Sequence, residues 1–115
     1  MTTQELVEKL IAYAGDDYDE SQLSYIESLI GSATAEVVHA LYKGPTTDVQ
    51  FEKLTAMALN RYAYNILAIS QYHYDKRGVE GVLSYKENTT QHTYEEGGHT
   101  PQGYFRGIIP IARII

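Results

Sequence analysis

The stretch DVQFEKLTAMALNRYAYNILAISQYHY, residues 48–74, decides the fold that this sequence predicts. Its 27 residues include no Gly and no Pro, so we expect a single helix of about seven turns. Asp48 is the candidate N-cap, although Phe51 stands where a capping box would place Glu or Gln. Two basic residues in the last turn, followed by Gly78, are typical of a helix C-terminus.

Within this helix, apolar residues recur at gaps of three and four positions, which is the spacing of one helix face. This stripe comprises Phe51, Leu54, Ala58, Tyr62, Ile66 and Ile69, and it continues at Tyr72 or His73. A second apolar group lies beside the stripe and comprises Leu59, Ala63, Tyr64 and Leu67. A helix that is apolar over more than one face is either central in its own fold or covered by another subunit, and both alternatives stay open. We predict that the second group forms an oligomer interface.

A second helix is predicted over residues 21–42, where apolar residues again recur at gaps of three and four. They are Leu23, Ile26, Ile30, Ala33, Val37 and Leu41. Gly44 and Pro45 end this helix. Because the connection to residue 48 is short, we expect the two long helices to form an antiparallel hairpin.

A short first helix is predicted over residues 2–14, which open with the capping-box pattern of Thr2 and Glu5 and end before Gly15. We expect it to pack across the hairpin. The fold class is therefore mainly α, with a small three-helix body formed by residues 1–78 of a single domain.

The acidic run DDYDE, residues 16–20, connects the first two helices. A calcium loop would need a Gly at position six and a Glu at position twelve, and this run lacks both. We therefore interpret it as a loop in which Asp19 or Ser21 caps the second helix. No metal site is predicted.

The chain changes character after residue 78. Residues 79–103 are polar, and we expect an extended loop or a β-hairpin in which Tyr85 and Tyr94 flank a turn. A single helical turn is predicted to start at Pro101. Residues 104–115, YFRGIIPIARII, form an apolar C-terminal arm, which packs either on its own body or on a neighbour. The residues predicted to dock a partner are Tyr85, Tyr94, Tyr104, Phe105, Ile108, Ile109, Ile111, Ile114 and Ile115.

Composition narrows the classes of function. The 115 residues carry a net charge of −6, and residues 1–52 alone carry ten acidic and two basic residues, which argues against a nucleic-acid-binding domain. There is no Cys, so neither disulfides nor thiol chemistry is expected. Neither a signal peptide nor a membrane span is predicted. Eleven Tyr against two Phe and no Trp favour half-buried and interface positions.

Catalytic motifs are not found. The four histidines are isolated, and no metalloprotease, phosphate-loop, nucleophile-elbow or dinucleotide motif occurs. We therefore expect a protein that is not an enzyme and needs no cofactor.

The chain resembles the head–tail connector (adaptor) proteins of long-tailed bacteriophages, of the type found in phages of Gram-positive hosts. The resemblance covers nearly the whole chain in order. It rests on the acidic loop that leads into LSYIESLIGSATAEV, the Gly-Pro turn before the helix ALNRYAYNILAISQYHYDKRG, and the polar segment GVLSYKENTTQHTYEEGG before an Ile-rich end.

The resemblance implies a structural role. Such proteins form a ring, typically of twelve copies, beneath the portal protein in the neck of the virion. The ring extends the DNA channel, docks on the portal above and receives a stopper or tail-completion protein below. DNA would pass through without sequence-specific binding, no membrane would be involved, and the subunits would occupy the host cytoplasm during assembly. The alternative is a small helical regulatory or DNA-binding protein.

Overall fold

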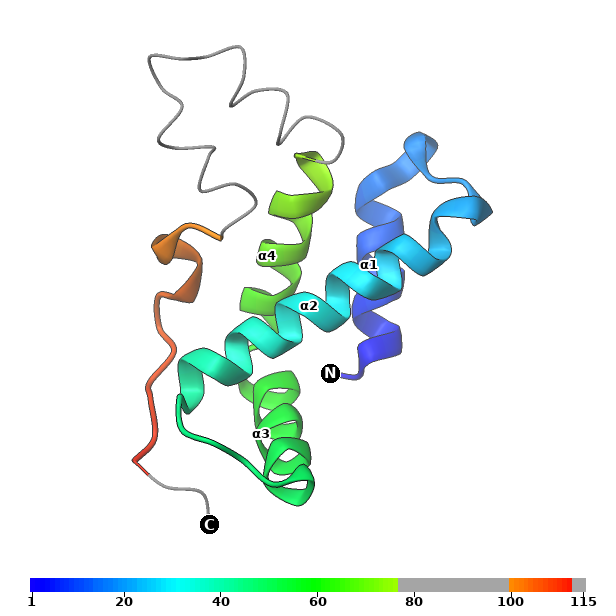
Figure 1. The fold of residues 1–115 in the computed structure, drawn as a ribbon. Coiled ribbons are helices and arrows are strands. Elements are labelled where there is room, and N and C mark those ends of the chain that lie inside the picture. Colours follow the sequence, from blue (N-terminus) through cyan, green and yellow to red (C-terminus); the bar gives the residue numbers. More distant parts are fainter. Residues whose placement is uncertain (77–99, 113–115) are drawn as a thin grey trace.

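The computed structural model describes residues 1–76 and 100–112 (Figure 1). Four α-helices make up the body: α1 (Thr3–Ala14), α2 (Leu23–Leu41), α3 (Asp48–Arg61) and α4 (Ala63–Asp75). Short 3-10 turns lie at Gly15–Asp17, Glu20–Gln22 and Gln102–Phe105. No strand occurs in these two ranges, so the mainly α class is confirmed. The predicted loop or β-hairpin falls almost wholly on residues 77–99, outside the described residues.

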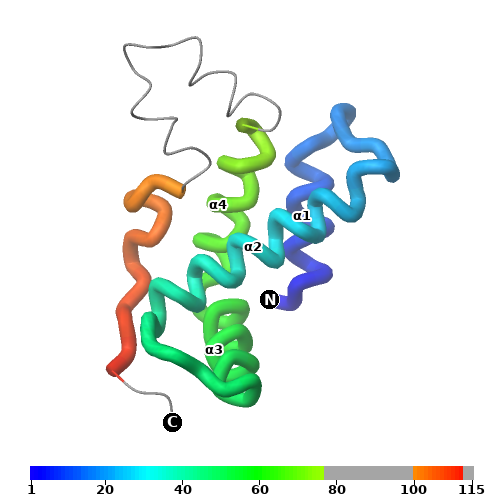
Figure 2. The backbone as a smooth tube through the Cα atoms, in the orientation of Figure 1, coloured from blue at the N-terminus to red at the C-terminus, as the bar shows by residue number. Residues whose placement is uncertain are grey.

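Helix α2 is the element on which the other three helices pack. It runs obliquely across both α3 and α4 and also contacts α1 (Figures 1 and 2). Its buried residues are Ile26, Ile30, Ala33, Thr34, Val37, Val38 and Leu41, which include the whole predicted stripe except exposed Leu23. The antiparallel hairpin is not confirmed, because α2 crosses two helices instead of lying along one.

The prediction of one helix over residues 48–74 is wrong, because the chain bends at Tyr62. This residue has φ −122° and ψ 28°, outside the α-helical range, and it separates α3 from α4. The hydrogen-bond ladder continues around the bend, since the Tyr62 N–H donates to the Ala58 carbonyl (2.8 Å) and the Tyr62 carbonyl accepts from Ile66 N–H (3.1 Å). Bends of this kind usually occur at Pro or Gly, and neither is present.

The bend has a reason in the packing. On α3 the buried residues are Leu54 and Ala58, and the next buried residue is Ala63 on α4. A gap of five residues on a straight helix would place Ala58 and Ala63 about 140° apart around the axis. The bend allows both residues to be buried while α3 and α4 both contact α2.

The helix ends follow local chemistry. The predicted capping box of α1 is confirmed, because Thr2 Oγ1 accepts from Glu5 N–H (3.1 Å) and Glu5 Oε1 accepts from Thr2 N–H (2.9 Å). That backbone hydrogen bond lowers the pKa of Glu5. Gly15 ends α1 with φ 59°, a conformation that favours Gly. Asp19 accepts from Ser21 N–H (3.0 Å) and so caps the 3-10 turn Glu20–Gln22, whereas the N-cap of α2 itself is Gln22 and not the expected Asp19 or Ser21.

The predicted cap of the third helix is wrong by one residue. Thr47, not Asp48, is the N-cap of α3, because Thr47 Oγ1 accepts from Gln50 N–H (3.2 Å). Gln50 Oε1 accepts in return from Thr47 N–H (2.9 Å), which completes a capping box. With Asp48 as the N-cap, the third helical position is Phe51, which cannot form a capping box. With Thr47 as the N-cap, that position is Gln50, which can.

Helix α1 is fixed to the other helices by its apolar face and by its two ends. Leu6, Val7 and Leu10 are buried in the core. At the C-terminal end, the Tyr13 hydroxyl donates to Asp75 Oδ2 of α4 at 2.7 Å. At the other end, the ammonium group of Met1 donates to the Leu59 carbonyl of α3 at 3.1 Å.

The core location of Ile66 leads to the first prediction. Ile66 is fully buried on α4, whereas Tyr64, two residues earlier, is 76% exposed. Ile66→Ala should lower the free energy of unfolding by about 3 kcal/mol, because it removes buried methyl groups and leaves a cavity. Tyr64→Ala, the matched control, should change it by less than about 0.5 kcal/mol. Denaturant titration by circular dichroism measures both, and equal losses would contradict this placement of the two residues.

The hydrogen bond between Tyr13 and Asp75 predicts a pH dependence. Donation to Asp75 raises the pKa of Tyr13 above its ordinary value of 10.0. A raised pKa stabilises the fold below the unfolded-state value, and this contribution is lost as the pH rises through the folded-state value. Tyr13→Phe should therefore be less stable than the parent near neutral pH, and the gap should close above about pH 10.

Thermal melts of the parent and Tyr13→Phe from neutral to alkaline pH measure this difference in stability. Asp75→Asn removes the acceptor charge and should reproduce the effect of Tyr13→Phe. A gap that stays constant over the whole pH range would show that the hydroxyl contributes nothing to stability through its ionisation.

Candidate functional site

Residues 100–112, here called the C-terminal segment, pack on the helical body. The Ile111 N–H donates to the carbonyl of Leu41 at the end of α2 (2.9 Å). The side-chain amide of Asn65 on α4 donates to the carbonyls of Tyr104 (3.0 Å) and Arg106 (3.2 Å). The described part of the C-terminal arm therefore packs on its own body.

The first residues of this segment are attached to the C-terminal half of α4. Oγ1 of Thr100 lies 2.8 Å from Nε2 of His73, within hydrogen-bond distance. The ring of Tyr104, in the 3-10 turn Gln102–Phe105, lies against the ring of Tyr72, with centroids 5.2 Å apart. The predicted helical turn is thus confirmed as a single 3-10 turn. It begins one residue later than expected, with Pro101 as its N-cap and not its first residue.

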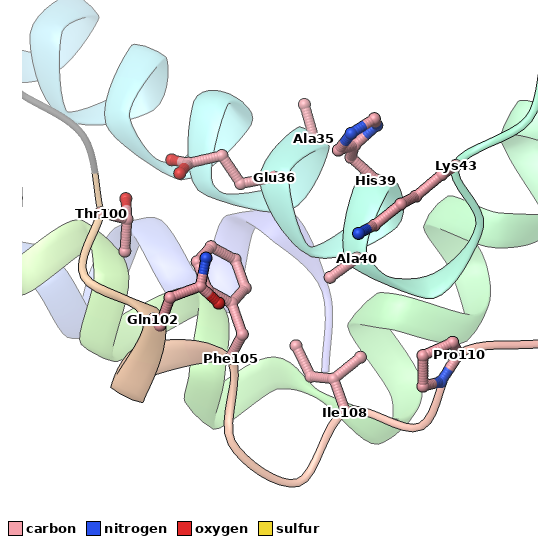
Figure 3. A pocket seen from close by; sticks show the side chains of 10 residues that line it. All are labelled: Ala35, Glu36, His39, Ala40, Lys43, Thr100, Gln102, Phe105, Ile108 and Pro110. Atoms are coloured by element: carbon pink, nitrogen blue, oxygen red, sulfur yellow. The ribbon is translucent and has the colours of Figure 1, made fainter.

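An open groove of about 850 Å³ lies between α2 and the C-terminal segment (Figure 3). One wall comes from the second half of α2 and the residues just after it, and comprises Ala35, Glu36, His39, Ala40 and Lys43. The other wall comes from the C-terminal segment and comprises Thr100, Gln102, Phe105, Ile108 and Pro110. Figure 3 shows the side chains of Phe105 and Ile108 directed toward α2.

The groove has a charged group toward each end and an apolar middle. Glu36 lies toward Thr100, and its Oε2 is 4.0 Å from Nε2 of His73. Lys43 extends back along the opposite end toward Ala40 (Figure 3). An apolar surface with charges at its margin suits the binding of a protein segment, whose apolar side chain would enter and whose charged groups would stay at the rim.

The groove contains no evident catalytic constellation. Its lining holds one carboxylate, one imidazole, one ammonium group and the hydroxyl of Thr100. The Thr100 hydroxyl and the Glu36 carboxylate approach the same nitrogen of His73, Nε2, and not opposite sides of the ring as in a catalytic triad. In the described ranges, no group of three or more His, Asp and Glu residues could hold a metal ion. The expectation of a protein that is not an enzyme stays a prediction.

The residues predicted to form an oligomer interface lie in three different environments. Tyr64 is 76% exposed and is free to contact another subunit. Ala63 is buried in the core of its own chain. Leu59 and Leu67 are half-buried and pack against that core. A charge at either leucine would therefore damage the fold as well as any interface.

The residues predicted to dock a partner also divide into groups. Ile109 is 71% exposed, and its N–H donates to the Tyr62 hydroxyl (3.3 Å). Half-buried residues that pack against the core are Tyr104, Phe105, Ile108 and Ile111. Tyr85, Tyr94, Ile114 and Ile115 lie outside the described residues.

The sequence reasoning missed two features of this surface. The groove was missed because Glu36, His39 and Lys43 become neighbours of the C-terminal segment only through the fold. The second feature is the first turn of α3, where Val49 is 61% and Phe51 44% exposed. Phe51 was assigned to the buried stripe, and this is wrong because burial on α3 begins only at Leu54.

Comparison of the chain with protein-family models, curated proteins and solved structures finds no match. Within residues 1–76 and 100–112, no helix is long and apolar enough to cross a membrane.

The contacts of Asn65 predict how the C-terminal segment is held. Asn65→Ala removes two hydrogen bonds to backbone carbonyls and should weaken the docking of the segment by about 1–2 kcal/mol. Hydrogen exchange should then be faster at Ile108 and Ile111, whose N–H groups are hydrogen-bonded at that end of the segment. Asn60→Ala, on the exposed side of α3, is the control and should leave these rates unchanged. Similar rates in both variants would mean that apolar packing alone holds the segment.

Proposed function

We propose that this chain is a structural head–tail connector (adaptor) subunit of a tailed phage, which assembles as a ring beneath the portal. The observation that carries the proposal is the division of the C-terminal segment into an inner and an outer face. Ile108 and Ile111 pack against the core, whereas Ile109 is 71% exposed. The segment can therefore bind a neighbouring protein through Ile109 while it remains on its own body.

The exposed apolar surface of the helices supports the same proposal. Tyr64 on α4 is 76% exposed, and large apolar side chains also lie exposed on the first turns of α2 and α3. A chain with a filled core and large apolar groups at several places on its surface suits a subunit with more than one neighbour. Among the residues of the predicted oligomer interface, Tyr64 is the one that can contact another subunit without any change in the core.

The charge distribution supports a role beside DNA that does not bind it. Residues 1–52, which include α1 and α2, carry a net charge of −8. Acidic side chains along a channel would repel the phosphates and keep the duplex from adhering as it passes. In this proposal the portal binds above, a stopper or tail-completion protein binds below, and about twelve copies form the ring, as the family resemblance implies. The proposed location is the neck of the virion.

Co-sedimentation with purified portal complexes tests this proposal. The parent chain should pellet with the portal, and Ile109→Asp should reduce the bound fraction at least about tenfold, because it places a charge at a buried contact. Ser32→Asp introduces the same charge at an exposed position of α2 away from its first turn and is the control. Thermal melts should show that neither substitution unfolds the chain, since both sites are exposed.

Two outcomes would count against the connector role. Failure of the parent chain to bind any portal complex would remove its main support. Tight, salt-sensitive binding of duplex DNA would favour the alternative of a regulatory or DNA-binding protein, because phosphate contacts weaken steeply as salt rises.

A further inference from the structure

The first turn of α3 forms an exposed apolar projection with acidic flanks. Val49 and Phe51 are 61% and 44% exposed, and the carboxylates of Asp48 and Glu52 are exposed on the same turn. Figure 1 shows that this end of α3 extends beyond the place where α2 crosses. We call residues 48–52 the α3 projection. Both apolar side chains therefore keep a large exposed fraction in the described part of the chain.

The groove between α2 and the C-terminal segment has the complementary character at its Lys43 end, whereas the carboxylate of Glu36 lies toward the other end. Its middle is apolar, with Ala40 on one wall and Phe105 and Ile108 on the other. Lys43 is exposed and reaches over one end of it (Figure 3). A phenyl ring in this groove would contact apolar groups on both walls, and carboxylates beside the ring would lie near the ammonium group of Lys43.

We infer that the α3 projection of one copy docks in the groove of the next copy. The projection cannot reach the groove of its own chain, because its turn is fixed by the Thr47–Gln50 capping box and by the burial of Leu54 one turn later. The contact therefore joins two copies. It uses a different surface on each of them, so it is heterologous and repeats from copy to copy into a ring or a filament.

This contact rests on the proposed function in one respect: a ring beneath the portal needs a repeating contact, and the α3 projection and the groove supply its two sides. It differs from the predicted interface at Tyr64, which lies on α4. Phe51 is the central apolar group of the contact, and Glu52 with Lys43 forms the charged pair at its edge.

Cysteine cross-linking tests the contact directly, because the chain has no Cys of its own. Asp48→Cys on the projection, which lies three residues before Phe51 on the same helix face, and Gln102→Cys in the groove wall are made as separate proteins of different tagged length and mixed under mild oxidation. We expect disulfide-linked heterodimers to exceed both kinds of homodimer at least about fivefold, since only a head-to-tail contact brings residues 48 and 102 together. The doubly substituted chain should give a ladder of higher oligomers.

The mixture is oxidised both free at high concentration and in the presence of portal complexes. No excess of heterodimers under either condition overturns the contact, whether or not the portal is bound. Heterodimers without any portal binding would uphold the contact and overturn the proposed connector role. The two proposals can thus fail separately.

Substitutions at the two sides of the contact provide the second measurement. Phe51→Ala should weaken self-association about tenfold or more, whereas Gln4→Ala, which truncates an exposed side chain of α1, should not. Lys43→Glu should weaken it about two- to fivefold, and adding Glu52→Lys should restore it. Lys9→Glu on α1 is the control for the charge change.

Sedimentation velocity over a range of concentrations measures these changes, with thermal melts to confirm that each variant is folded. Unchanged self-association in Phe51→Ala and Lys43→Glu overturns the contact. Loss of portal binding without loss of self-association in the same variants would assign the groove to the portal, and this result also overturns it.

Discussion

The burial of α2 against both α3 and α4 is the constraint on which the rest of the structure depends. Small side chains in this core, among them Ala33, Ala58, Ala63 and Ser70, are almost fully buried and allow the helix backbones to approach closely. The buried hydroxyl of Ser70 on α4 is satisfied by two carbonyls, that of Ile66 in its own helix (2.9 Å) and that of Leu29 on α2 (3.4 Å). The bend at Tyr62 follows from this constraint, since a straight helix could not present both halves to one crossing helix.

The C-terminal segment depends on the same arrangement. It has little regular structure, so its backbone groups need partners from outside the segment. The helices supply several of them: the carbonyl of Leu41, the amide of Asn65 and the hydroxyl of Tyr62. Tyr62 therefore serves twice, as the residue where the chain bends and as an acceptor for the segment. A segment held in this way leaves a groove along α2.

The distribution of apolar surface connects the fold with the proposed role. A body of this size has one core, and that core is filled by four helices and the inner face of the C-terminal segment. Exposed apolar side chains lie at separate places, which include the first turns of α2 and α3, the start of α4 and the outer face of the C-terminal segment. One chain with several such places suits a subunit between neighbours, which is the basis of the connector proposal.

The sequence alone determined the helical class, the capping box of α1, its end at Gly15 and the buried face of α2, because these depend on contacts between residues a few positions apart. It could not place the bend at Tyr62, because no Pro or Gly marks this position. The bend arises because Ala58 and Ala63 are both buried against the core. Phe51 is exposed because the contact of α2 with α3 does not extend to the first turn of α3. The groove depended on residues 35–43 and 100–110 meeting in space. Such long-range relations are decided by the tertiary structure, since packing over the whole core overrides the periodicity of a single segment.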